Sequence, residues 1–128
     1  MKTIELPILK DRRGSLIAVE HISGKLPFSA KRSFFICDVP QGEKRAGHAT
    51  NADHFLLALR GSVTIHVVDK AGIMQKTILN KTNVGLHIPP LNYLELCDFS
   101  EHALLAVYSS LSYEEVEYFS LAELQQDE

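Results

Sequence analysis

Short runs in which apolar and polar residues alternate are the feature that most restricts the fold of this chain. In the range 62–69 every second residue is apolar, from Val63 through Val67, which puts these side chains on one face of an extended strand. Residues 69–72 then suit a tight turn, and 73–79 read as the returning hairpin partner. The pattern predicts an all-β protein.

The same alternation predicts most of the remaining elements, and Gly and Pro residues separate them. The further predicted strands are 3–9, 16–20, 32–38, 55–59, 85–88, 93–96 and 103–109. Only the tail has helical spacing, with Ser120 as the N-cap and Glu123 completing a capping box. We therefore expect one β-sandwich or jelly roll with a short C-terminal helix.

The length of 128 residues suits a single hydrophobic core, so residues 1–128 are expected to form one domain. The formal charge of -3 and the lack of a basic block disfavour nucleic acid as a partner. The longest apolar run, 55–59, is far shorter than the roughly 18 residues of a membrane span. The N-terminus lacks an apolar leader, which predicts a cytoplasmic protein with no membrane partner. Cys37 and Cys97 are expected to be buried reduced thiols.

The segment from Gly42 to Gly61 carries the most informative spacing. Five residues separate Gly42 from His48, Thr50 stands two positions after His48, and His54 precedes Gly61 by six intervening residues. This frame resembles the first motif of the cupins, in which a His-x-His pair and an acidic residue occupy the positions of His48, Thr50 and His54. The resemblance implies a cupin jelly roll, a double-stranded β-helix.

Period two puts His48 and Thr50 on one strand face. The resemblance to the cupin motif implies that this face points into the barrel together with His54, so the three side chains are expected to converge. Two imidazoles and one hydroxyl are a poor set for a transition metal, which usually has three good N or O ligands in a catalytic site. Leu94 stands where metal-binding cupins supply another histidine. We expect no metal and no other cofactor, and a metal-dependent cupin such as a dioxygenase is disfavoured.

A second set of motifs resembles the sugar-nucleotide 3,4-ketoisomerases, which include WxcM-like cupins. In chain order these motifs are DRRGSL at 11–16, PF at 27–28, KRSFFI at 31–36, RAGHA at 45–49, GS at 61–62 and DFS at 98–100. The resemblance spans nearly the whole chain. It implies a metal-free homodimer with exchanged N-terminal strands, acting on a dTDP-4-keto-6-deoxyhexose whose ketone moves between C4 and C3.

The resemblance also implies that His48 takes part in acid/base catalysis, since in the family two histidines of a His-Ala-His triplet share this work. Thr50 replaces the second histidine, and its hydroxyl is too weak a base at pH 7. Phe34 and Phe35 lie where relatives have tyrosine. His54 can supply a second imidazole, which makes His48, Thr50 and His54 the catalytic candidates.

The alternative is a catalytically altered or inactive cupin that binds a nucleotide sugar and serves surface-polysaccharide synthesis. In either case Arg13, Arg32 and Arg45 are candidate contacts for the diphosphate, because Arg binds phosphate oxygens bidentately. Each could instead be a solvated surface residue. Tyr93 is a candidate stacking partner for the base or sugar, although an aromatic residue on a strand is usually core.

Overall fold

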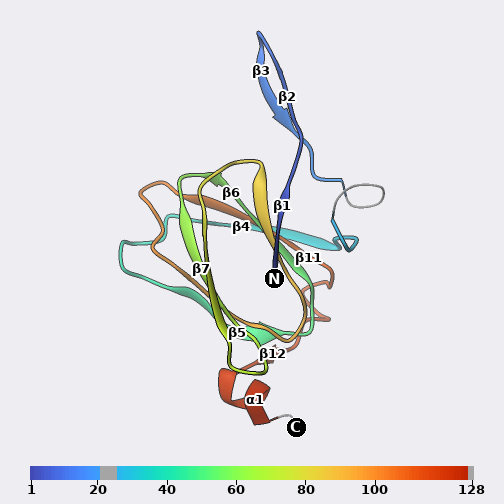
Figure 1. The fold of residues 1–128 in the computed structure, drawn as a ribbon, viewed down its shortest axis with the longest axis vertical. Coiled ribbons are helices and arrows are strands. Elements are labelled where there is room, and N and C mark those ends of the chain that lie inside the picture. Colours follow the sequence, from blue (N-terminus) through green and yellow to red (C-terminus); the bar gives the residue numbers. More distant parts are fainter. Residues whose placement is uncertain (21–25, 127–128) are drawn as a thin grey trace.

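The computed structural model describes residues 1–20 and 26–126, and it contains two five-stranded antiparallel sheets packed face to face (Figure 1). The first sheet has the order β1-β9-β6-β11-β4. Its strands are β1 (Lys2–Glu5), β9 (Val84–Ile88), β6 (His54–Arg60), β11 (Leu104–Ser109) and β4 (Arg32–Cys37). The second sheet has the order β12-β5-β10-β7-β8. Its strands are β12 (Tyr118–Phe119), β5 (Arg45–Thr50), β10 (Tyr93–Cys97), β7 (Val63–Val68) and β8 (Met74–Leu79).

The core lies between the two sheets and follows from the alternation in the sequence. Leu56, Ile65 and Leu105 face inward from β6, β7 and β11 and are fully buried. On β7 the apolar residues from Val63 to Val67 are buried, as the period-two pattern predicts. The all-β prediction is therefore confirmed.

The N-terminal segment differs from its prediction, because the expected strand 3–9 is two strands. The chain breaks at Pro7, which has no backbone N–H to donate to a sheet. Residues before the break form β1, which pairs with β9, and residues after it form β2 (Ile8–Asp11). Within the described ranges β2 pairs only with β3 (Gly14–Ile17), and this hairpin projects from the sandwich (Figure 1). The strand predicted at 16–20 is therefore found at Gly14–Ile17, closer to the turn of the hairpin.

The C-terminal helix α1 (Leu121–Gln126) begins where the capping box predicts. The Glu123 backbone N–H donates to Ser120 Oγ at 3.1 Å, and the Ser120 N–H donates to Glu123 Oε1 at 3.0 Å. The side chain of Leu124, in this helix, is buried. Within residues 1–20 and 26–126, no helix has the length and apolarity that a membrane crossing requires.

The two cysteines have different environments. Cys97 is buried at the end of β10, as expected. Cys37 is exposed, so the prediction of a second buried thiol is wrong. The reason is strand parity on β4, where Ile36 faces the core and both Phe35 and Cys37 face outward.

Candidate active site

A cavity of about 240 Å³ opens between the two sheets. Its walls are mostly apolar, and both sheets contribute to them. The apolar lining consists of Phe34, Ile36, Leu56 and Val107 from the first sheet, Ala46, Leu94 and Leu96 from the second, and Val116 from the segment before β12. A small number of polar side chains in an apolar, concave site is the usual form of a small-molecule pocket.

All three catalytic candidates line this cavity. His48 and Thr50 come from β5, and His54 comes from the start of β6 in the opposite sheet. The sequence-based expectation that these three side chains converge therefore agrees with the geometry. The short turn 51–53 between β5 and β6 brings His54 across to face His48.

A β-bulge sets the direction of His48. Leu94 of β10 pairs with His48, but the next residue, Glu95, pairs with Ala46, so Gly47 is an extra residue on β5. Ala46 and Gly47 both have left-handed backbones, with φ of 68° and 85°. A left-handed alanine is unusual and disfavoured, and such local strain is found most often at functional sites. The bulge places both Arg45 and His48 in the lining of the cavity.

Burial controls the charge of both histidines. His54 is only 9% exposed, and burial lowers its pKa to about 4, with further lowering by the nearby His48 and Arg32 and an opposing effect of Asp53. Burial also lowers the pKa of the half-buried His48. Both rings are therefore neutral at pH 7 and can accept a proton.

The Thr50 hydroxyl is engaged in the turn that follows β5. Its Oγ1 accepts a hydrogen bond from the Ala52 backbone N–H at 3.2 Å and lies 3.5 Å from the Ala52 carbonyl oxygen. Side-chain-to-backbone bonds of this kind stabilise turns. Thr50 thus holds the turn that carries His54, a role the sequence reasoning did not foresee.

Two of the predicted arginines, Arg32 and Arg45, line the cavity. The Arg32 guanidinium lies 4.5 Å from the centre of the Phe34 ring and 5.1 Å from that of the Tyr113 ring. The described residues of the lining include no Asp or Glu, so the two arginines give the cavity a positive field. Such a field favours an anionic ligand.

Arg13 and Tyr93 lie outside the cavity. Arg13 is at the turn of the β2–β3 hairpin, with its side chain 79% exposed and bound to Asp11 at 2.7 Å. Tyr93 is on the outer face of β10, where its hydroxyl donates to Glu95 at 3.4 Å. The sequence contained the signal for Tyr93, because Leu94 and Leu96 must face inward and therefore turn Tyr93 outward.

Sequence reasoning missed Tyr118. This residue lines the cavity from β12, and its ring meets the His48 ring edge to face, with centroids 4.6 Å apart. The pairing of Tyr118 with Thr50 in the sheet fixes this position. No local pattern in the tail indicated β12, which has only two residues.

Across residues 1–20 and 26–126, no three side chains of His, Cys, Asp or Glu come together as potential ligands of a metal ion.

The two-sheet fold and the cavity between its sheets define this protein as a cupin, and solved structures agree. The TDP-quinovose 3,4-ketoisomerase WlaRB from Campylobacter jejuni superposes with a TM-score of 0.91 and is 32% identical, covering 98% of this chain and 97% of that one. QdtA, a sugar 3,4-ketoisomerase from Thermoanaerobacterium thermosaccharolyticum solved with TDP, superposes with a TM-score of 0.84 at 29% identity, covering 91% and 85%.

Sequence comparisons lead to the family. The family described as WxcM-like, C-terminal matches residues 1–124, and this chain belongs to that family. The TDP-4-oxo-6-deoxy-alpha-D-glucose-3,4-oxoisomerase of Aneurinibacillus thermoaerophilus is 35% identical over 118 residues, which are 91% of this chain and 84% of that protein.

Proposed function

We propose that this protein is a sugar-nucleotide isomerase that moves the ketone of a dTDP-4-keto-6-deoxyhexose between C4 and C3 without a metal. The observation that carries the proposal is the cavity in which two neutral imidazoles, His48 and His54, lie with Arg32 and Arg45. Imidazoles can move protons near neutral pH, and arginines suit a diphosphate. Membership of the WxcM-like family supports the substrate class.

The reaction needs only proton transfers. A base removes the C3 proton, the C3–H electrons form a C3=C4 double bond, and O4 takes up the negative charge of an enediolate. O4 gains a proton, O3 loses its proton, and C4 is protonated as the C3 carbonyl forms. The sum of these steps transfers one hydrogen from C3 to C4 and one from O3 to O4.

His48 is the proposed base, because it is less buried than His54 and its basicity is less reduced. With a pKa of about 4, His54 stays neutral and suits hydrogen bonding to the sugar oxygens, where it donates through one nitrogen and accepts through the other. Thr50 contributes by holding the turn before His54.

Solvent exchange tests this assignment directly. Incubation of the 4-keto substrate in heavy water should place deuterium on the sugar ring, and His48→Asn should slow this exchange by roughly 10²-fold to 10⁴-fold while dTDP binding persists. His66→Asn is a matched control, since His66 lies on β7 and does not line the cavity. Equal exchange by the wild type and His48→Asn would exclude His48 as the base.

One observation favours the alternative, a cupin that binds a nucleotide sugar without turning it over. The Thr50 hydroxyl, at the position of the second family histidine, is committed to a turn and has no titratable proton at pH 7. A protein that binds dTDP-sugar and shows no exchange in heavy water would support this alternative. If Thr50→His then started the exchange, the missing imidazole would be the cause.

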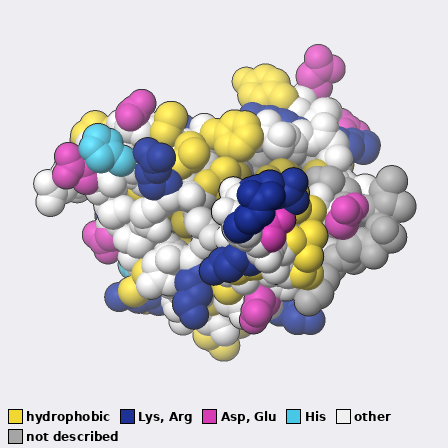
Figure 2. Space-filling model, turned by 90° about the horizontal axis from the view of Figure 1, so that it is seen from above, with side chains coloured by type: hydrophobic (Ala, Val, Ile, Leu, Met, Phe, Trp, Pro, Cys, Tyr) yellow, Lys and Arg dark blue, Asp and Glu magenta, His cyan; other side chains and the backbone are white. Residues whose placement is uncertain are grey.

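The position of Arg13 bears on the oligomer. We propose a homodimer with exchanged N-terminal strands, supported by the projecting hairpin, whose exposed Leu9 and Leu16 pair across its two strands. Seen from the hairpin end, Lys and Arg side chains gather beside apolar ones (Figure 2). Because Arg13 lies outside its own chain's cavity, its proposed contact with diphosphate requires a second chain.

Metal independence has its own test. Elemental analysis of the purified protein should find less than one Zn, Fe or Mn per chain, and treatment with a chelator should leave the heavy-water exchange unchanged. One tightly bound metal per chain would overturn this part of the proposal.

A further inference from the structure

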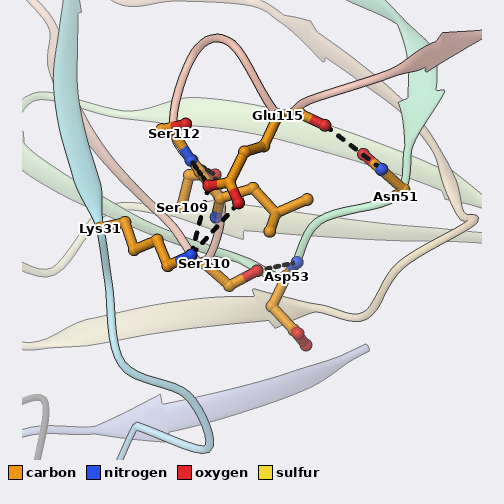
Figure 3. A network of polar contacts seen from close by, with 8 residues as sticks. Lys31, Asn51, Asp53, Ser109, Ser110, Ser112 and Glu115 are labelled. Carbon is orange, nitrogen blue, oxygen red and sulfur yellow. Dashed lines mark hydrogen bonds and ion pairs between the residues drawn. The ribbon is translucent and has the colours of Figure 1, made fainter.

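The segment 110–119, between β11 and α1, is fastened beside the cavity by polar contacts (Figure 3). Ser110 Oγ accepts a hydrogen bond from the Asp53 backbone N–H at 2.8 Å. The Glu115 carboxylate lies 3.3 Å from Lys31 Nζ and accepts a hydrogen bond from the Ser112 N–H at 3.0 Å. These contacts tie the segment to the start of β4 and to the turn between β5 and β6.

Asn51 ties the same segment to the end of β5. Its Oδ1 accepts a hydrogen bond from the Glu117 backbone N–H at 2.9 Å, and its Nδ2 donates to the Glu115 carbonyl oxygen at 3.5 Å. One side chain therefore holds two backbone groups of the segment just before β12, which itself pairs with β5. The segment is a fixed part of the cavity wall.

The segment brings Tyr113 onto Arg32. The guanidinium carbon of Arg32 is 5.1 Å from the centre of the Tyr113 ring, although Tyr113 is 70% exposed. Stacking on an aromatic ring restrains an arginine and leaves its in-plane N–H groups available for an oxyanion. Tyr113 thus restrains the orientation of a cavity cation without occupying its donors.

The segment also brings Tyr118 onto His48. The Nδ1 atom of His48 is buried and has no hydrogen-bond partner within the described part of the chain. Catalytic histidines usually gain their orientation from a hydrogen bond at the second nitrogen. Here the ring of Tyr118 restrains the ring of His48 instead, through an edge-to-face contact with 4.6 Å between the centroids.

We infer that segment 110–119 positions both halves of the site, with Tyr113 orienting Arg32 for the diphosphate and Tyr118 orienting His48 for proton transfer. The inference rests on the proposed function and adds two positioning residues to it. Its consequence is that one loop controls ligand binding and proton transfer through two separate aromatic contacts.

Steady-state kinetics should show opposite signatures. Tyr113→Leu should raise KM about threefold to fivefold with kcat unchanged, the size expected from an exposed cation–π contact. Tyr118→Leu should lower kcat about tenfold or more with KM within twofold, because a misplaced base slows the chemical step. The conservative variants Tyr113→Phe and Tyr118→Phe keep the rings and should retain the positioning of Arg32 and His48 that the leucine variants lose.

Asn51→Ala, which releases the segment, should show both signatures in one protein. If Tyr113→Leu and Tyr118→Leu instead lowered kcat and raised KM alike, the residues would have a general structural role and the inference would fail. It would fail equally if neither variant changed either parameter.

Two measurements do not depend on turnover. The pKa of His48, followed by NMR, should rise towards its ordinary value in Tyr118→Leu, because water reaches the ring, and should not move in Tyr113→Leu. Neither variant replaces another titratable or charged group of the cavity lining, namely His54, Arg32 or Arg45. Calorimetry with dTDP should show weaker binding only for Tyr113→Leu. If the pKa of His48 did not change in Tyr118→Leu, the proposed role of Tyr118 would be refuted.

Failure of the proposed function gives a different pattern. A wild type that binds dTDP but shows no exchange would remove the isomerase assignment and leave both NMR and calorimetry to decide the positioning roles. A wild type that binds no dTDP would refute the role of Tyr113 together with the proposed function, while the titration of His48 would still decide the role of Tyr118.

Discussion

The sandwich and the N-terminal hairpin contain the same kind of sequence and have opposite environments. In the sandwich, alternating residues such as Leu105 are fully buried between two sheets. In the β2–β3 hairpin, Leu9 pairs with Leu16 across the strands, yet these side chains are 66% and 57% exposed. Alternation therefore predicts that a strand forms, but it does not tell whether the apolar face is covered by the same chain.

The largest expected effect contrasts the two regions directly. Leu105→Ala should lower the free energy of unfolding by about 2–5 kcal/mol, because it opens a cavity in a closely packed core. Leu9→Ala should change the unfolding of an isolated chain by less than about 0.5 kcal/mol, as an exposed substitution does. Urea denaturation of both variants under monomeric conditions measures the difference, and equal losses would contradict the contrast.

The second prediction concerns acid. His54 titrates near 6.5 in the unfolded chain and near 4 in the folded one, so the folded state favours the neutral ring. The resulting stability is complete above pH 6.5 and is lost as the pH falls from 6.5 to 4, a loss on the order of 3 kcal/mol. Denaturation at several pH values should show this slope. His54→Gln should flatten it and His66→Gln should not.

A smaller effect tests whether a second chain covers the hairpin. Leu9→Ser should weaken a homodimer about tenfold, as expected when roughly 1–2 kcal/mol of apolar contact is removed. Light scattering across micromolar concentrations measures the change. A wild type that is monomeric under these conditions would show that the hairpin remains exposed, and the contrast with the sandwich would then be complete.

The smallest expected effect lies at the other end of the chain. Ser120→Ala should cost about 1 kcal/mol, because it removes the cap of a helix with only six residues. Glu123→Gln is the matched control, since glutamine also completes a capping box. Amide hydrogen exchange at the Glu123 backbone should quicken in the first variant and remain near the wild-type rate in the second.

The features that sequence reasoning predicted are local ones. The hairpin turn at 69–72 is closed by the Gly72 N–H donating to the Asp69 carbonyl at 3.0 Å, and the helix cap has the predicted bonds. The convergence of His48 and His54 was expected from the spacing within Gly42–Gly61 together with its resemblance to the cupin motif. Each of these depends on residues that are close in the chain, so a short pattern contains the necessary information.

The features that were missed depend on distant pairs. Tyr118 meets His48 only because a two-residue strand, β12, pairs with β5. Whether Cys37 is buried depends on which face of β4 meets the second sheet, and its apolar neighbours Phe34 and Phe35 occupy both faces. A single sequence does not contain these pairings, since many partners satisfy the same local alternation.

The bulge at Gly47 determines which chemical groups share one enclosure. Arg45 and His48 are three positions apart, an odd number, and along a regular strand an odd separation sends two side chains to opposite faces. The additional residue restores even parity, and both side chains reach the cavity. If β5 paired with β10 without the bulge, the same residues would place Arg45 and His48 on opposite faces of the sheet. In this protein the pairing register of β5, and not only its composition, determines that Arg45 and His48 face the same cavity.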